Sequence, residues 1–186
     1  SGIGYSSIRI RGSDQSRINV TINGVPYNDS ESMTVYWVDL PDFASSVESI
    51  QIQRGVGTST NGAGAFGGSI NIQTNVASEV STFEINNTIG SFNTIKNSVA
   101  FSTGFIDNKF ELSGRLSRIK SSGYIDRSGS KLRSYFLQGI YRDENTLVKI
   151  LNFAGHEITD QAWFGVDSET LKINRKYNFA GEYYDD

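Results

Sequence analysis

The stretch Thr82–Arg118, TFEINNTIGSFNTIKNSVAFSTGFIDNKFELSGRLSR, decides the fold class of this chain. Apolar and polar residues alternate within three of its segments, Thr82–Gly90, Thr94–Phe105 and Lys109–Arg118. A period of two places every second side chain on the same face of a β-strand. Because each segment has about the ten residues that a tilted strand needs to cross a bilayer, we interpret them as transmembrane strands.

The links between these strands differ in length; the first, 90–93, is short and carries no signal, whereas the later links alternate. The series continues with the segments Leu132–Arg142 and Leu147–Phe153. The links 106–108 and 143–145 are short, whereas 120–131 and the stretch from about His156 onward are long. Outer-membrane barrels have short periplasmic turns and long extracellular loops. The alternation therefore predicts an antiparallel meander of barrel strands and places residue 76 on the periplasmic side.

Residues before 76 have a different rhythm, with short apolar runs between polar and glycine-rich links. We expect four short strands there, Ser7–Arg11, Arg17–Ile22, Ser49–Arg54 and Ser69–Thr74. Asn23-Gly24 predicts a tight turn, because both residue types tolerate positive φ. Pro41–Val47 is the best helix candidate, since proline suits a first helical turn. The prediction is a mainly β chain with an α+β domain at 1–76 and the first strands of an incomplete barrel at 77–186.

Composition excludes several classes of protein. The net charge of -3 and the pI of about 5.2 argue against a nucleic-acid partner. The absence of cysteine excludes a disulfide scaffold and a cysteine zinc site. No apolar run approaches the roughly 20 residues of a spanning helix. The chain begins at Ser1 without an apolar signal segment, which we interpret as the sign of a processed chain or of a piece of a longer one.

Four motifs before residue 76 resemble, in order and spacing, the plug domain of TonB-dependent receptors. They are Ile8–Gly12 (IRIRG), Val20–Pro26 (VTINGVP), Ser49–Gly55 (SIQIQRG) and Asn61–Thr74 (NGAGAFGGSINIQT). Asn23 stands where the family usually has Asp, and Gln51 stands where it has an acidic residue. A further stretch, Asn174–Tyr184, resembles a loop of such receptors from Bacteroidetes.

The resemblance implies an active transport receptor of the bacterial outer membrane. It would import a small metal chelate (a ferric siderophore, haem or cobalamin) with energy from TonB, which would contact a box upstream of Ser1. Membrane lipid would surround the barrel, and neither a catalytic residue nor a cofactor is expected. The alternative is a secreted or surface β-rich adhesin without transport, which should show a regular internal repeat. The sequence shows no such repeat.

Two plug loops, 28–37 and 58–66, would form the floor of the extracellular ligand site. The candidate ligand-binding residues are Ser30, Glu31, Ser32, Tyr36, Trp37 and Phe66. Tyr36 and Trp37 have a second interpretation as core residues. Asp29 and Glu31 together could suggest a metal, but two neighbouring carboxylates in a loop are usually solvated.

The resemblance also implies a lock between plug and barrel. Arg11 and Arg54 would pair with carboxylates of the barrel wall, and Glu48 is a possible substitute for the acidic residue that Gln51 replaces. The glycines expected to allow positive φ or tight packing are Gly12, Gly24, Gly55, Gly62, Gly67 and Gly68. The GAGAFG segment fits a dinucleotide-binding pattern only literally, because a strand follows it where a helix is needed. His156 has no second metal ligand at a useful spacing.

Overall fold

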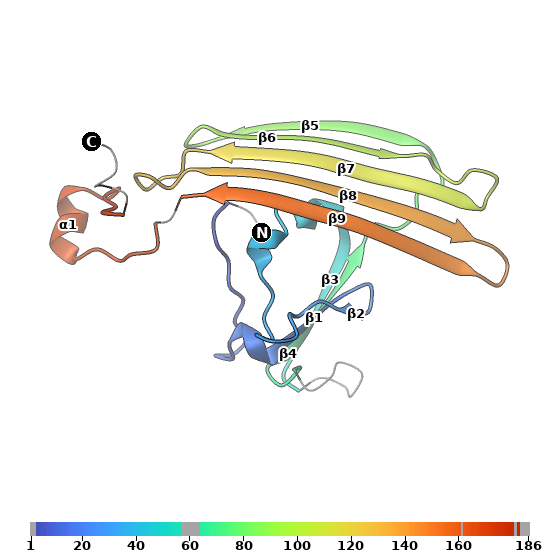
Figure 1. Ribbon diagram of the computed structural model, residues 1–186, viewed down its shortest axis with the longest axis horizontal. Helices are drawn as coiled ribbons and strands as arrows, with labels where there is room; N and C mark the ends of the chain where they lie inside the picture. Colours follow the sequence, from blue (N-terminus) through green and yellow to red (C-terminus); the bar gives the residue numbers. More distant parts are fainter. Residues whose placement is uncertain (1–2, 57–63, 161, 181, 183–186) are drawn as a thin grey trace. The chain divides into compact units, whose positions relative to one another are not determined.

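The computed structural model describes residues 3–56, 64–160, 162–180 and 182. The chain divides into two compact units, Ser1–Ser78 and Glu79–Asp186. Strands form most of the regular structure in both, which confirms the predicted mainly β class (Figure 1). Among the described residues, no helix is long and apolar enough to cross a membrane.

The first unit contains a four-stranded sheet in the order β2-β1-β4-β3. Its strands are β1 (Ile18–Ile22), β2 (Val25–Pro26), β3 (Val47–Arg54) and β4 (Gly68–Thr74). β1 and β4 run parallel in the middle of the sheet, and the other pairs are antiparallel. All residues of β1 are buried, which is the pattern of a strand covered on both faces.

Two predicted elements of this unit were wrong. Ser7–Arg11 is not a strand, because Arg11 (φ 48°) and Gly12 (φ 82°) turn the chain and leave only an isolated bridge between Ile10 and Ser13. The helix expected at Pro41–Val47 is a single 3₁₀ turn, Phe43–Ser46. Asp42 lies in the left-handed region (φ 55°) and cannot continue a right-handed helix.

The second unit contains a five-stranded antiparallel meander, as predicted. Its strands are β5 (Thr82–Gly90), β6 (Thr94–Ser102), β7 (Phe110–Ser121), β8 (Ser130–Arg142) and β9 (Leu147–Thr159). Each strand pairs with the next one along the chain. The connections 103–109 and 143–146 lie at one end, while 91–93, 122–129 and the segment after Thr159 lie at the other. The contrast in link length is smaller than predicted, because 103–109 and 122–129 have seven and eight residues.

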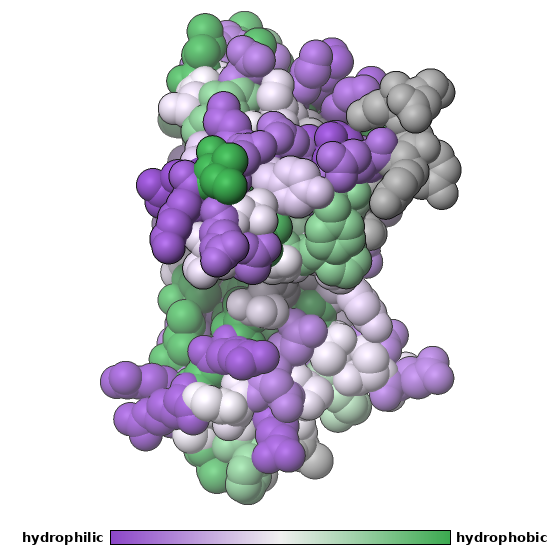
Figure 2. Space-filling model, turned by 90° about the vertical axis from the view of Figure 1, so that its left-hand side faces the viewer, coloured by the Kyte–Doolittle hydropathy of each residue, from purple (hydrophilic) through white to green (hydrophobic). Residues whose placement is uncertain are grey.

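Three boundaries in this unit differ from the sequence prediction. β9 continues to Thr159, so His156 lies within a strand and not at the start of a loop. β7 and β8 are also longer than expected, which shortens the loop between them to 122–129. A helix that the sequence analysis missed, α1 (Ser168–Ile173), begins where the Asp167 carboxylate accepts hydrogen bonds from the backbone N–H groups of Glu169 and Thr170. The surface of this end of the molecule is mixed, with hydrophilic side chains beside exposed hydrophobic ones such as Ile173 (Figure 2).

The strand register gives the meander two chemically different faces. One face, called here the apolar face, carries large exposed hydrophobic side chains. Its members include Phe83, Ile85, Ile89, Ile95, Phe101, Phe110, Leu112, Leu116, Leu137, Ile150 and Ile158. The other, called the polar face, carries Ser98, Glu111, Arg115, Ser117 and Gln138, together with the buried apolar side chains of Ile119, Leu132, Phe136 and Ile140. Exposed apolar side chains along one whole face are what a sheet with lipid on that side requires.

Candidate functional site

Several loops of the first unit gather at one edge of its sheet. The register places Ile18 of β1 beside Gly68 of β4, and Gly68 beside Arg54 of β3. The start of β1, the start of β4 and the end of β3 therefore share this edge, which we call the loop edge. The residues next to these strand ends, 11–17, 55–56 and 64–67, lie there for the same reason.

The loop 28–34 returns to the loop edge through Asn28. The side-chain Oδ1 of Asn28 accepts a hydrogen bond from the backbone N–H of Val20 (2.7 Å). Its Nδ2 donates to the carbonyl oxygens of Ile18 and Met33 (2.9 Å each). One amide group thus fastens the loop to the first strand of the sheet and closes the loop on itself.

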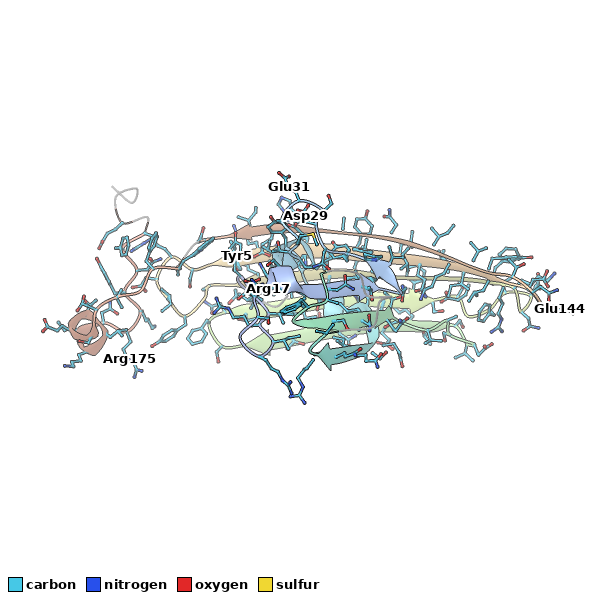
Figure 3. All side chains as sticks on the ribbon, turned by 90° about the horizontal axis from the view of Figure 1, so that it is seen from below. Tyr5, Arg17, Asp29, Glu31, Glu144 and Arg175 are labelled. Atoms are coloured by element: carbon cyan, nitrogen blue, oxygen red, sulfur yellow. The ribbon has the colours of Figure 1, made fainter. Side chains whose placement is uncertain are left out.

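Asp29 organises the tip of the same loop. Its Oδ1 accepts hydrogen bonds from the backbone N–H of Ser32 (2.7 Å), the Ser32 hydroxyl (2.8 Å) and the backbone N–H of Glu31 (3.2 Å). These bonds to Ser32 hold the pKa of the Asp29 carboxyl below its ordinary value, because they favour the charged form. Asp29 and Glu31 lie close together on the loop, with Glu31 at its outer end (Figure 3).

The predicted ligand-binding residues of this loop differ in their availability. Ser30 and Glu31 are exposed. Ser32 is less available, because its hydroxyl contacts both Asp29 and Thr34. Tyr36 is 53% exposed and precedes the 3₁₀ helix Trp37–Asp39, in which Trp37 is half-buried. Tyr36 is therefore not a core residue.

A second loop adjoins the first. A Cβ placed on Gly64 would lie 3.5 Å from the Met33 side chain, so residues of the two loops are neighbours at the loop edge. Phe66, a predicted ligand-binding residue, is 64% exposed there. Residues 57–63, including the predicted structural glycine Gly62, lie outside the described residues.

The predicted glycines act in two ways. Gly12, Gly24 and Gly55 adopt positive φ (82°, 83° and 87°), which suits a residue without a Cβ. Gly67 and Gly68 do not adopt positive φ. A Cβ on Gly67 would lie 2.5 Å from Ser13 Cβ, and one on Gly68 would lie 2.8 Å from the Gln53 carbonyl oxygen, so close packing is what requires these two glycines.

The residues of the predicted lock are all exposed. Arg11 is in the turn before Gly12, and Arg54 ends β3 at the loop edge. Glu48 lies where the β3–β4 register shifts between Val47 and Ser49. Arg54 lies six positions along the strand from Glu48, or about 20 Å, so the two cannot pair with each other. The lock remains a proposal.

Sequence reasoning missed the residues that shape the loop. It did not assign a role to Asn28 or Met33, and it treated Asp29 as a solvated carboxylate. The run Asn28-Asp29-Ser30 carried a usable signal, because Asn and Asp side chains commonly bond to nearby backbone N–H groups. Within the described residues, no group of three or more His, Cys, Asp or Glu side chains could hold a metal ion.

Comparison with known proteins assigns the first unit. The family model described as TonB-dependent Receptor Plug Domain matches residues 1–69. By this match, the first unit is similar to the plug domain of TonB-dependent receptors. The loop edge is therefore an edge of a plug-like sheet. Receptors with this plug are transporters of the bacterial outer membrane and not enzymes, which agrees with the predicted class and localisation.

Solved structures extend the similarity to both units. The unliganded ferric citrate transporter FecA aligns with a TM-score of 0.71 and 20% identity, covering 94% of this chain and 28% of that one. The copper transporter OprC aligns with a TM-score of 0.67 and 19% identity, covering 88% and 28%. The pyoverdine receptor FpvA from Pseudomonas aeruginosa PAO1 aligns with a TM-score of 0.63 and 13% identity, covering 80% and 22%.

These alignments show the fold, which is a plug followed by barrel strands. The chain spans less than a third of the length of each of these three structures. No curated protein matches the sequence.

Proposed function

We propose that this chain is part of an outer-membrane receptor that imports a small metal chelate, a ferric siderophore, haem or cobalamin, with energy supplied through TonB. Two observations together support the proposal. Residues 1–69 match the plug family, and two loops adjoin at one edge of the sheet in this unit. The named structures with the same fold include a ferric citrate transporter and a pyoverdine receptor.

The chemistry of the loop edge supports a small polar ligand. The loop 28–34 is held by its own hydrogen bonds, so its exposed groups are presented with little further cost in conformational entropy. Glu31 and Ser30 supply polar groups there, and Tyr36 and Phe66 supply exposed aromatic surface. Small-molecule sites typically combine apolar and aromatic surface with a few polar groups.

Uptake by cells that carry the full-length protein tests the proposal. Iron-limited cells are given labelled ferric siderophores, haem or cobalamin, with and without a functional TonB. We expect TonB-dependent accumulation of one of these chelates. Binding and uptake of oligosaccharides alone would contradict the proposed ligand class, and uptake that persists without TonB would contradict the coupling.

A pair of variants locates the site. The double substitution Tyr36→Ala and Phe66→Ala should weaken chelate binding by about tenfold or more, because it removes two exposed aromatic contacts. Val25→Ala is the control, since Val25 is also exposed but lies beside the turn at the opposite edge of the sheet. Equal chelate binding by the double variant and the control would show that the loop edge is not part of the ligand site.

A further inference from the structure

A row of polar side chains crosses the apolar face of the five-stranded sheet. Register aligns the row through all five strands, as Asn87, Asn97, Arg118, Arg133 and His156. The next row towards the loop 122–129 places Lys120 opposite Lys131. Arg118, Arg133, Lys120 and Lys131 thus form a cluster of basic residues, here called the basic row pair. The cluster lies at the end of the apolar face that is next to the loop 122–129.

The basic row pair places like charges opposite each other. Arg118 faces Arg133, and Lys120 faces Lys131, with about 5 Å between the Cβ atoms of opposed residues in such a sheet. Like charges in directly opposed positions destabilise an antiparallel pair. An anion that lies across these charges would relieve the repulsion between them.

The strands themselves do not supply that anion. Their carboxylates, Glu84, Glu111 and Glu157, all project from the polar face. Within the five strands, which the structure describes completely, no Asp or Glu occupies the apolar face. The strands therefore leave Arg118 and Arg133 without a carboxylate on their own face, and an anion that balances them would come from outside the strands.

An open groove of about 420 Å³ adjoins the arginines. The register row below them, Ile85, Val99, Leu116 and Tyr135, forms its apolar floor, and Arg118 and Arg133 line it as well. Leu116 is 65% exposed and Ile85 is 62% exposed. A groove with an apolar floor and a cationic end matches an amphiphile whose hydrocarbon chain ends in an anionic group.

We propose that this groove binds a membrane lipid whose headgroup carries a net negative phosphate. An acyl chain lies along Leu116 and its row, and the phosphate oxygens accept hydrogen bonds from Arg118 and Arg133, whose planar guanidinium groups match phosphate geometry. Lys120 and Lys131 add charge at the headgroup. The inference rests on the proposed function in one respect, because it takes the apolar face to be in contact with the bilayer.

A free phosphate ion or an acidic protein fits these observations less well. A free ion would leave the apolar floor of the groove unused. An acidic protein would have to displace lipid from the hydrophobic side chains around the row, including Ile85 and Leu116. A lipid accounts for both the apolar floor and the charges, and the test below distinguishes it from the other two ligands.

The test measures lipid binding by the full-length protein purified in detergent. Phosphatidic acid and phosphatidylcholine with the same acyl chains are titrated, and bound lipid is counted by native mass spectrometry. We expect clear preference for phosphatidic acid. Arg118→Gln with Arg133→Gln should weaken that binding roughly 30-fold, from the contribution of two basic residues at an anionic lipid surface.

The control removes the same charge elsewhere. Lys109→Gln with Arg175→Gln changes two exposed cations that lie outside the strands and the groove, and it should bind phosphatidic acid as the wild type does. Arg118→Lys with Arg133→Lys keeps the charge and should recover part of the affinity. Heat-dependent gel mobility shows whether each variant forms a folded barrel, and Lys120→Gln with Lys131→Gln supplies an independent test if the arginine variant does not fold.

Several results would overturn the inference. They are equal binding of the two lipids, unchanged binding after loss of both arginines, displacement of the lipid by millimolar inorganic phosphate, or salt-sensitive capture of an acidic protein in place of lipid. Chelate uptake by the same variants separates this inference from the proposed function. Loss of lipid binding with normal uptake supports the lipid site alone, whereas absence of TonB-dependent uptake by the wild type contradicts the proposed function and leaves the lipid measurement standing.

Discussion

Asn23 and Thr74 join the two central strands of the plug sheet at the edge opposite the loops. Asn23 Nδ2 donates to Thr74 Oγ1 (2.9 Å), and the backbone N–H of Thr74 donates to Asn23 Oδ1 (3.0 Å). The backbone N–H of Asn23 also donates to the carbonyl oxygen of Ile72 (2.8 Å). A side-chain amide both donates and accepts hydrogen bonds, so Asn23 can make both of these bonds to Thr74. An ionised carboxylate at position 23 could accept but not donate.

Asn23→Ala should therefore destabilise the plug sheet by about 1–2 kcal/mol, because it removes both side-chain hydrogen bonds between Asn23 and Thr74. Positive φ at Asn23 (51°) adds strain for alanine. Asn23→Asp keeps the acceptor and should cost less. Hydrogen exchange of Ile18–Ile22 in the full-length protein should be faster in Asn23→Ala than in Asn23→Asp. Equal exchange in the two variants would contradict this ranking of stability.

Gly68→Ala should destabilise the plug by about 1–3 kcal/mol, the usual cost of overpacking. The added Cβ would lie 2.8 Å from the backbone carbonyl oxygen of Gln53. Because the clash is with the backbone, no side-chain movement can relieve it. Gly64→Ala is the matched control, since its Cβ would meet only Met33 Cε at 3.5 Å. Urea unfolding of the plug, followed by hydrogen exchange of β4, should separate them, and a neutral Gly68→Ala would contradict the packing argument.

The loop 28–34 should lose order in acid. The pKa of Asp29 is lowered in the folded loop by bonds from Ser32. A carboxyl group whose pKa is lowered on folding contributes stability above its unfolded pKa of about 3.8, and the contribution is lost as pH falls through the lower, folded value. Exchange of this loop, corrected for intrinsic rates, should therefore rise only below about pH 4.

Asp29→Asn tests the same point without changing pH. The amide cannot become charged, so the loop should exchange faster at neutral pH and show no further acid step. Asp167→Asn is the control, because it removes a similar carboxylate cap from α1 and should leave the loop 28–34 unchanged. A persistent acid step in Asp29→Asn would assign the transition to another group.

The loop 122–129 and the segment 176–180 should order each other. Arg127 Nε donates to the carbonyl oxygen of Ala180 (2.8 Å), and its guanidinium also donates to the Asn178 carbonyl oxygen. Asn178 Nδ2 donates in turn to the Asp126 carbonyl oxygen (2.9 Å). Asn178→Ala should increase limited proteolysis in both segments, whereas Arg175→Ala, an exposed neighbour, should not. Cleavage confined to one segment would contradict mutual ordering.

The isolated 186-residue chain should associate in the absence of detergent. In the five-stranded sheet β5 and β9 each leave one edge without a strand partner, and the apolar face exposes large side chains. Exposed edges and apolar patches of this kind promote pairing between chains. Sedimentation velocity provides the measurement, and a stable soluble monomer would contradict the expectation.

The sequence by itself determined the class of each unit. Period-two alternation in Thr82–Arg118 predicted the meander and its two faces, because alternation is a local property of an extended chain. The motif order before residue 76 identified the plug, and Asn23-Gly24 predicted the turn after β1, where both residues adopt positive φ.

Tertiary structure decided what depends on partners far apart in the chain. Pairing with β8 extended β9 through His156, although the sequence there does not alternate cleanly. The same pairing set Arg118 opposite Arg133, an alignment that no single segment contains. Asn28 acquired its role because Ile18 and Val20 lie beside it only in the folded sheet. Hydrogen bonds between distant strands fix register, and register determines which side chains meet.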